Sequence, residues 1–461
     1  MTAATRAFAP APVEARIAVV LAGLLGCGAA VAGFGAAVSD LRLAAAGGAT
    51  AAGALFVLMA AGWVDPLVVV VLSLPLPAFY STPSLRIATA APVTVVAVAA
   101  WLTRLGLADE RALPGRIPFR SLTVLAMAVA LATVTAQYPL TSIRESVNLV
   151  VLFALLVAAT DLFRRNARHV EHAVIALVAA AAVCGVLAVL ETLTILPGEF
   201  PRFDSGYNRA ALGFGQPNGL GLFLALTLPL GVHRFRITRG PGRWAAAFAL
   251  LSAAAGLIAT FSRGAWLALL AGTIALVFTG DRRLVFRVWL AAALLVLVAD
   301  VVSGGAMRET VERSIGDWVI EQRAALMLAG IMMFMAYPLT GVGPGGYAGS
   351  LDRFGPQIPQ LWDYLPTPHN AYVQMAAETG LFGLIAFTVF LGATVVAQVR
   401  RTRAEDATAS AERASLNRAL LWSFATCCAA GMVVWPLAHG TGQAVVLLAA
   451  GIFAVPPAKA G

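Results

Sequence analysis

The chain contains little charge for its length. Charged side chains make up 12% of the 461 residues, whereas apolar residues make up 60%. Soluble domains carry roughly 25% charged residues, so this composition excludes an ordinary soluble protein and requires most of the surface to face lipid. The mean hydropathy of +0.83 supports the same conclusion. No hydrophilic domain is appended, and because the apolar run 17–36 is followed directly by another, we expect no cleavable signal.

Residue patterns that hold metals and nucleotides are also scarce. The cysteines lie inside apolar runs without metal-ligand spacing, which predicts small packing side chains; they are Cys27, Cys184, Cys427 and Cys428. The sequence has no Asp-x-Asp pair to ligate a divalent cation. The glycine run 341–346 lacks the lysine and the serine or threonine of a nucleotide-binding loop. Gly343 and its neighbours either approach a substrate phosphate or form a tight structural turn, which we favour. We therefore expect no cofactor and no metal.

The apolar runs predict membrane-spanning helices. Each crossing needs about 20 mainly apolar residues. The candidate segments are 17–36, 43–62, 64–80, 88–103, 119–136, 143–163, 170–191, 211–232, 244–261, 264–280, 285–303, 371–397, 418–437 and 440–457. The segment 64–80 is short and can pair with its neighbour as a re-entrant hairpin. The sequence therefore predicts an all-α polytopic membrane protein with twelve to fourteen spans.

The loops between these spans alternate in charge. Of the 32 lysines and arginines, 22 fall on one face, which also receives both termini. Basic loops stay in the cytoplasm, so we predict cytoplasmic termini. This distribution also explains the net charge of +9 without a nucleic-acid partner, because the basic residues lie in short loops and not in one stripe.

The outer face receives short connections and one long segment, 304–370. We expect its first part to be a helix along the membrane surface or across the outer ends of the spans. Its second part, 339–370, is rich in turn residues and predicts irregular structure. The predicted organisation is an N-terminal bundle at 1–303, this loop, and C-terminal helices at 371–461, all within one integral membrane domain.

His369 opens an apolar helix directly after that polar stretch. Proline favours the first helical turn, so Pro368 places His369 at a helix N-terminus. The helix dipole there disfavours the imidazolium, which keeps the ring neutral and able to accept a proton near pH 7. The alternative is a histidine that caps the helix or hydrogen-bonds a loop carbonyl. Competing candidates on this face are His439 and, more weakly, the lone Asp40.

Three arginines on the same face are candidates for binding an anion. Arg263 lies between two spans with almost no loop, where an arginine at full membrane depth costs roughly 2.5–3.5 kcal/mol. Either a bound anion offsets that cost or the side chain extends to the headgroups. Arg209 precedes a segment in which Pro217 interrupts helical hydrogen bonding and Asn218 offers polar atoms. This segment lines a substrate site or is a kinked packing element. Arg323, taken alone, predicts a solvated or headgroup-facing side chain.

Together these residues are suited to chemistry on a lipid-linked anion. Contacts between arginine and phosphate are charge-assisted and contribute roughly 1.5–3 kcal/mol each. Two such contacts on a diphosphate would stabilise it as a leaving group. A neutral histidine beside them would deprotonate an incoming hydroxyl.

The chain resembles the O-antigen ligase and polymerase superfamily of bacterial inner-membrane glycosyltransferases. The matching pieces are His369-Asn370 with Gly380-x-x-Gly383, the stretch PLTGVGPGGY at 338–347, Ser262-Arg263 with Leu267, the pair Pro217-Asn218, and Arg323 ahead of PLTGVG. The specific similarity covers residues 205–390. The predicted span count can exceed the twelve spans usual in the family.

This resemblance implies a GT-C-type helical fold with a periplasmic active site. Members transfer a glycan from undecaprenyl diphosphate to a hydroxyl, without a nucleotide sugar and without a metal, and the resemblance implies an inverting transfer here. By the same resemblance, His369 would be the base, and Arg263 and Arg323 would bind the diphosphate. Arg209 would be a further diphosphate contact, and Asn370, Asn218 and Gly343 would support the site.

The acceptor distinguishes the members of the family. In ligases it is a lipid A–core sugar, in polymerases another lipid-linked unit, and in some relatives a protein hydroxyl. The lack of a large extra periplasmic domain favours a ligase over a protein-modifying relative. We expect a ligase, with a polymerase as the alternative within the same chemistry. A transporter or flippase of lipid-linked substrates is the alternative from another class. Such proteins carry charged residues at mid-membrane and internal repeats, and neither is evident in the sequence.

Overall fold

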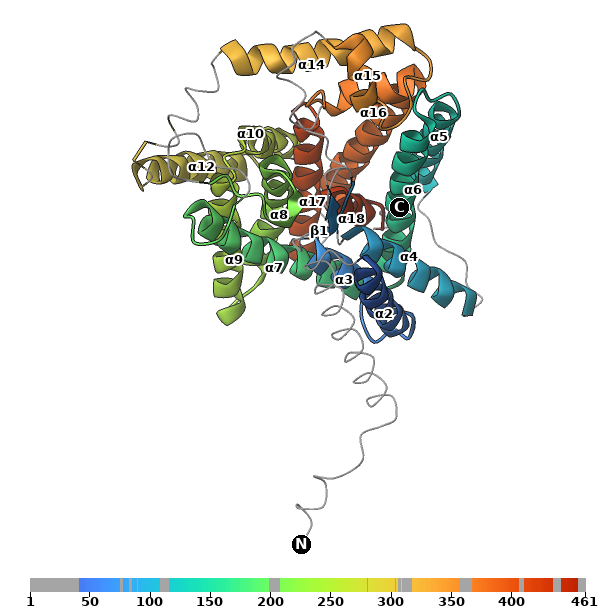
Figure 1. Cartoon of the computed structure of the whole chain (residues 1–461). Helices are drawn as coiled ribbons and strands as arrows, with labels where there is room; N and C mark the ends of the chain where they lie inside the picture. Colours follow the sequence, from blue (N-terminus) through green and yellow to red (C-terminus); the bar gives the residue numbers. More distant parts are fainter. Residues whose placement is uncertain are drawn as a thin grey trace.

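The computed structural model describes residues 41–74, 78–82, 85–88, 90–107, 116–198, 208–279, 281–302, 304–305, 308, 317–355, 367–405, 410–433 and 441–454. In these ranges the regular secondary structure is helical apart from one short hairpin (Figure 1). The predicted fold class, an all-α polytopic membrane protein, is confirmed. The predicted span 17–36 and the candidates Asp40 and His439 lie outside the described residues.

In the first half of the chain, the described residues form the hairpin, seven α-helices and one 3-10 turn. These are α2 (Leu41–Ala60), α3 (Pro66–Ser73), β1 (Ala78–Thr82), β2 (Leu85–Ala88), α4 (Ala90–Leu107), α5 (Arg116–Val134), α6 (Pro139–Arg165), α7 (Ala167–Thr192), the 3-10 turn η2 (Leu212–Phe214) and α8 (Pro217–Ile237). The second half follows with α9 (Pro241–Ala259), α10 (Arg263–Gly272), α11 (Ile274–Val277), α12 (Arg282–Val302), α14 (Asp317–Ala336), α15 (Tyr347–Phe354), α16 (Ala371–Glu405), α17 (Ala411–Ala430) and α18 (Thr441–Ala454).

Seven of the described helices are long and apolar enough to cross a membrane: α4, α6, α7, α8, α9, α12 and α16. Each coincides with a predicted span. The extreme case is α12, whose most apolar window has no buried residue. Phe286, Leu290 and Leu297 are each about half exposed or more, which a helix tolerates only when lipid covers it. The total of twelve to fourteen spans stays a prediction.

Several elements differ from the predicted spans. The segment 64–80 contains the eight-residue α3, capped by Asp65, and then β1, which pairs antiparallel with β2. The segment 264–280 divides into α10 and α11 at Thr273. The stretch 339–370 was predicted to be irregular, but it contains α15, whose polar and apolar residues alternate at helical spacing in YAGSLDRF.

The centre of the bundle is α8. Its Leu220, Phe223, Leu226 and Leu230 are fully buried, and it packs against α7, α9 and α17. Small residues allow the neighbouring α7 and α9 to approach each other: a Cβ on Gly185 would lie 2.1 Å from the Ser252 carbonyl oxygen. Close backbone approach at glycine is how helices associate in lipid, where apolar burial supplies little driving force.

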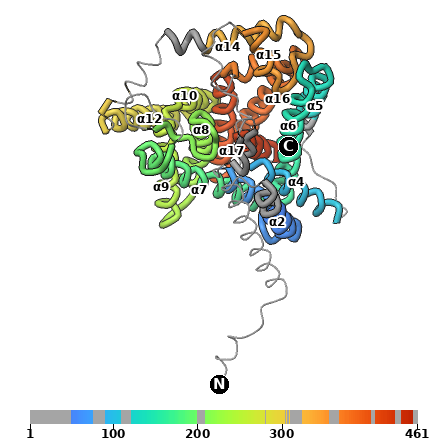
Figure 2. The backbone as a smooth tube through the Cα atoms, viewed as in Figure 1, coloured from blue at the N-terminus to red at the C-terminus, as the bar shows by residue number. Residues whose placement is uncertain are grey.

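The basic loops meet at one end of the bundle. Asp281 pairs with Arg236 at 3.6 Å and with Arg418 at 3.8 Å, and Arg234 pairs with Glu171 at 3.4 Å. Loops predicted to share a face are therefore in contact there. At the opposite end, α14 lies across the top of the bundle with α15 and the start of α16, as Figure 2 shows.

Candidate active site

The helix α16 begins just after His369, the predicted base. Asn370 accepts hydrogen bonds through Oδ1 from the backbone N–H groups of Tyr372 (3.0 Å) and Val373 (3.1 Å). Asn370 is therefore the N-cap, and His369 lies one residue before it with φ of 49°. The prediction that Pro368 occupies the first helical turn is therefore wrong, since Pro368 lies two residues before the N-cap. Asparagine is a stronger N-cap than the residues around it. The placement of His369 at a helix N-terminus is correct.

The surroundings of His369 favour the neutral ring. Burial and, secondly, the positive charge of Arg323 lower the pKa of His369 below its ordinary value of 6.5. A lowered imidazole pKa leaves the ring unprotonated at pH 7, as a proton acceptor requires. The sequence predicted a neutral ring from the helix dipole, whereas the structure attributes it to burial and a neighbouring cation.

The charge of Arg323 also acts on Arg263. The pKa of Arg263, which lies outside the seven long spans, is lowered by burial and then by Arg323. Arg323 is on α14 and Arg263 is the first residue of α10, so residues 60 positions apart in the sequence lie close in space. Like charges gathered in a partly buried place repel each other, and a bound anion would relieve that repulsion. This cluster of Arg263, Arg323 and His369 is called the cationic cluster below.

The start of α10 is held against the start of α8. Ser262 Oγ donates to Asn218 Oδ1 at 2.9 Å, and a Cβ on Gly221 would lie 2.8 Å from the Ser262 Cβ. Arg209 Nε donates to the Thr260 carbonyl at 3.3 Å, which places Arg209 against the turn that leads into Arg263. The two predicted polar elements, Arg209 and Asn218, therefore join the same region as Arg263.

The prediction that Pro217 breaks a span is wrong. Pro217 occupies the first turn of α8, where it has no hydrogen bond to lose. The preceding residues form η2, and Gly215 with φ of 74° ends it. The polar atoms of Asn218 lie at a helix start and not at a kink within a helix.

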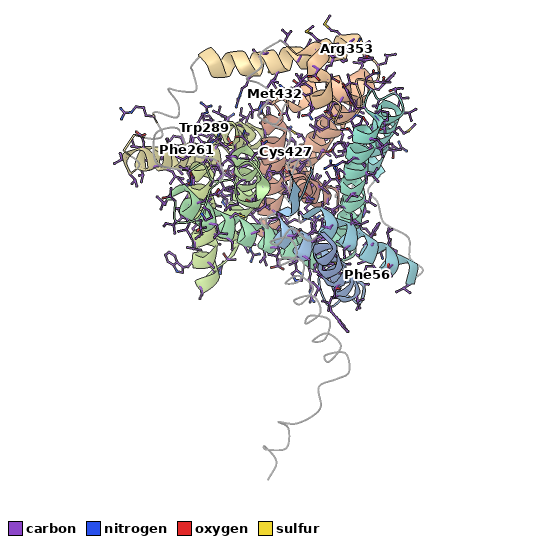
Figure 3. All side chains as sticks on the ribbon, in the orientation of Figure 1. Phe56, Phe261, Trp289, Arg353, Cys427 and Met432 are labelled. Carbon is purple, nitrogen blue, oxygen red and sulfur yellow. The ribbon has the colours of Figure 1, made fainter. Side chains whose placement is uncertain are left out.

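Three helix N-termini gather around the cationic cluster. The end of α17 connects two of them: the Ala371 N–H at the start of α16 donates to the Gly431 carbonyl, and a Cβ on Gly264 in α10 would lie 2.8 Å from Val433 Cγ2. Met432, which lies between Gly431 and Val433 in the sequence, is seen below α14 in Figure 3. The start of α8 joins through Ser262. Helix N-termini carry partial positive charge and bind anions, so the region as a whole favours a negatively charged ligand.

The glycine-rich loop docks on a break in α16. At Gly380 the helix is interrupted, with φ of 65° and ψ of −162°. The loop satisfies the backbone groups that the break frees: the Val342 N–H donates to the Ala377 carbonyl and the Leu381 N–H to the Pro338 carbonyl. A Cβ on Gly343 would lie 2.4 Å from the Ala136 Cβ, so Gly343 is required for packing. This geometry is that of the tight structural turn.

Sequence reasoning missed three buried polar residues near this region. Glu378 is 6% exposed, and its Oε2 accepts the Gly345 N–H at 2.9 Å. Glu191 Oε2 accepts hydrogen bonds from the N–H groups of Ala211 and Leu212, two and three residues after Arg209. The third is Tyr347. The sequence could have indicated the two glutamates, because each lies within an apolar helix, where a carboxylate is costly unless it is hydrogen-bonded.

The described residues contain no group of three or more histidines, cysteines, aspartates or glutamates arranged to hold a metal ion. The cationic cluster combines two positively charged arginines with a histidine whose ring is neutral at pH 7. The arginines suit an anionic ligand.

A comparison with protein families finds a match to the O-antigen ligase family over residues 247–388. The matched segment contains all of the cationic cluster and the glycine-rich loop, which confirms the superfamily that the motifs indicated. Arg209 and Asn218 precede it. A search of the curated proteins finds no match to the chain.

Proposed function

We propose that the protein transfers a glycan from undecaprenyl diphosphate to the hydroxyl of an acceptor sugar. The coarser assignment, a glycosyltransferase-like membrane enzyme of the O-antigen ligase family, follows from the family match. The finer assignment rests on one observation. Arg323 lowers the pKa of both His369 and Arg263, so a histidine and two arginines lie close together, and this supports their roles as proton acceptor and phosphate ligands.

The proposed reaction is a single displacement at the anomeric carbon. A neutral His369 takes the proton from the acceptor hydroxyl as its oxygen forms the new bond to that carbon. The bond from the same carbon to the diphosphate oxygen breaks, and the diphosphate leaves with the electron pair. Arg263 and Arg323 stabilise the charge that develops on it, with Arg209 as a further contact. Attack opposite the leaving group inverts the anomeric configuration, and no metal takes part.

The charge distribution supports a periplasmic site. The starts of α10 and α16, at the cationic cluster, contact Gly431 and Val433 just beyond the end of α17, whereas Arg418, which pairs with Asp281, lies in the first half of α17. Because basic loops stay in the cytoplasm, we place the cluster on the periplasmic face of a bacterial inner membrane, with both termini cytoplasmic. The lipid-linked donor would reach it from the bilayer.

A ligase is the favoured assignment, with a lipid A–core sugar as the acceptor. The alternative is a polymerase that extends another lipid-linked glycan. The deciding experiment incubates the purified protein with a lipid-linked glycan and offers lipid A–core and a second lipid-linked unit in separate reactions. Extension of lipid A–core supports the ligase, and extension of the lipid-linked unit supports the polymerase.

The variant His369→Ala tests the proposed base in the same assay. We expect it to abolish transfer while the protein remains folded and inserted. The matched control is His172→Ala, because His172 is half exposed and lies beside Asp65, on an element outside the cluster. Transfer by His369→Ala at the wild-type rate would remove His369 from the mechanism. Translocation of the lipid-linked glycan without any glycosyl transfer would instead support the flippase.

A further inference from the structure

Tyr347 connects the glycine-rich loop to the helix that carries Arg323. It is the first residue of α15 and is only 2% exposed. Its hydroxyl donates a hydrogen bond to the carbonyl oxygen of Leu326 in α14. Leu326 follows Arg323 by three residues, which is about one helical turn. The bond therefore acts on the turn of α14 that presents Arg323.

Tyr347 is in turn fixed to α16 through Glu378. The Glu378 carboxylate accepts the Gly345 N–H at 2.9 Å and the Gln374 side-chain N–H at 3.3 Å. The Glu378 backbone carbonyl accepts the Gly343 N–H at 3.0 Å. Only one residue separates Gly345 from Tyr347, so these bonds leave the tyrosine little freedom to move relative to α16. His369 lies just before the first turn of the same helix.

A close contact between α14 and α16 lies farther from Arg323. A Cβ on Gly330 would lie 2.7 Å from Val373 Cγ1, so the two helices cross there. Gly330 is seven residues beyond Arg323, whereas the bond from Tyr347 is three residues beyond it. Since Arg323 and Arg263 carry like charges, repulsion drives the start of α14 away from α10. The tyrosine bond opposes that movement at the nearer point.

We propose that Tyr347, held in place by Glu378, is a positioning residue that keeps Arg323 beside His369 and Arg263. The proposal rests on the proposed function for what Arg323 binds, whereas the placement of Arg323 is independent of it. Tyr347 would touch neither the donor nor the acceptor. Its removal would loosen the diphosphate site and leave the base in place.

The test measures the pKa of His369 directly, by NMR of the full-length protein with isotope-labelled histidine in lipid nanodiscs. The His369 signal is assigned by its loss in His369→Gln. Arg323 is the charged group that lowers the pKa of His369 besides burial, so Arg323→Gln should raise that pKa. Tyr347→Phe should raise it in the same direction by a smaller amount, because Arg323 then moves away without being lost.

Tyr138→Phe is the matched control. The Tyr138 hydroxyl also donates to a carbonyl of α15, that of Gly349, but it comes from the connection between α5 and α6 and does not reach α14. This variant should leave the His369 pKa unchanged. In the transfer assay, Tyr347→Phe should raise the donor KM by about 2- to 10-fold, the effect of losing one hydrogen bond, with a smaller effect on kcat.

The outcomes separate the two proposals. A His369 pKa that is unchanged in Tyr347→Phe, or equally changed in Tyr138→Phe, overturns the positioning role, and so does an unchanged pKa in Arg323→Gln. A raised pKa in Tyr347→Phe alone, in a protein that transfers no glycan, supports the positioning role and counts against the proposed function.

Discussion

Replacing Gly380 by alanine should strongly destabilise the protein. With φ of 65° and ψ of −162°, Gly380 occupies a region that essentially only glycine adopts, and other residues pay about 1–3 kcal/mol to enter it. The new Cβ would also lie 2.3 Å from both the carbonyl carbon and oxygen of Leu339 and 2.4 Å from the Thr340 nitrogen. These are backbone atoms that cannot rotate away, and such overpacking adds about 1–3 kcal/mol.

The two costs together are about 2–6 kcal/mol, a large share of the 5–15 kcal/mol that stabilises a typical protein. The strain falls on the contact between the glycine-rich loop and α16. We therefore expect the loop to separate from the break, with loss of the bond from the Leu381 N–H to the Pro338 carbonyl. Transfer activity should fall with it.

The measurement is the thermal unfolding midpoint of the purified protein in detergent. The matched control is Gly392→Ala in the same helix, because a Cβ at Gly392 meets no atom within 4 Å. Alanine is a better helix former than glycine by about 1 kcal/mol, so the control should be as stable as the wild type or slightly more stable. If Gly380→Ala unfolds at the same temperature as Gly392→Ala, the reasoning about the break is refuted.

Three further predictions concern the site. Arg263→Ala and Arg323→Ala should each lower kcat/KM for the lipid-linked donor about 10- to 100-fold, the effect of one charge-assisted contact; wild-type kinetics in both would place the phosphates elsewhere. Glu191→Ala should reduce transfer and stability because two buried N–H groups lose their acceptor, whereas Glu171→Ala, at an exposed carboxylate, should do neither. Because the pKa of His369 is lowered, transfer should hold as pH falls to 6.5 and decline only below it; a decline that begins above 6.5 contradicts a neutral, buried base.

The cluster could be predicted in outline because its members carry local signals. Arg263 is conspicuous as a charge between two apolar runs, and His369 follows the long polar segment. Arg323 was the weakest of the three, since one arginine on a surface helix predicts nothing by itself. Arg323 matters because it lies near His369, and this proximity depends on how α14 crosses α16. That crossing depends on Gly330 and Tyr347, and the local sequence around these two residues does not predict their contacts.

The glycine-rich loop shows a different limit. Its composition predicted a tight turn but not the partner, which is the break in α16 some 40 residues later. From the sequence alone, Gly380 is one glycine within a long apolar helix, and it predicts only a small loss of helix stability. Only the backbone of residues 338–342, lying across it, makes glycine obligatory there. Pro217 was predicted to interrupt a helix but instead begins one. A proline does either, and where the preceding turn ends decides which.

By itself, the amino-acid sequence determined that this is a membrane protein and located the seven helices long and apolar enough to cross a bilayer. It also predicted which basic loops share a face. Those properties follow from the cost of placing each side chain in hydrocarbon or in water, and that cost is set locally along the chain. The tertiary structure alone decided which polar groups meet. Glu378 and Gly345, Tyr347 and Leu326, and Arg323 and His369 come from segments whose contact is determined by helix packing and by the need to satisfy buried backbone groups.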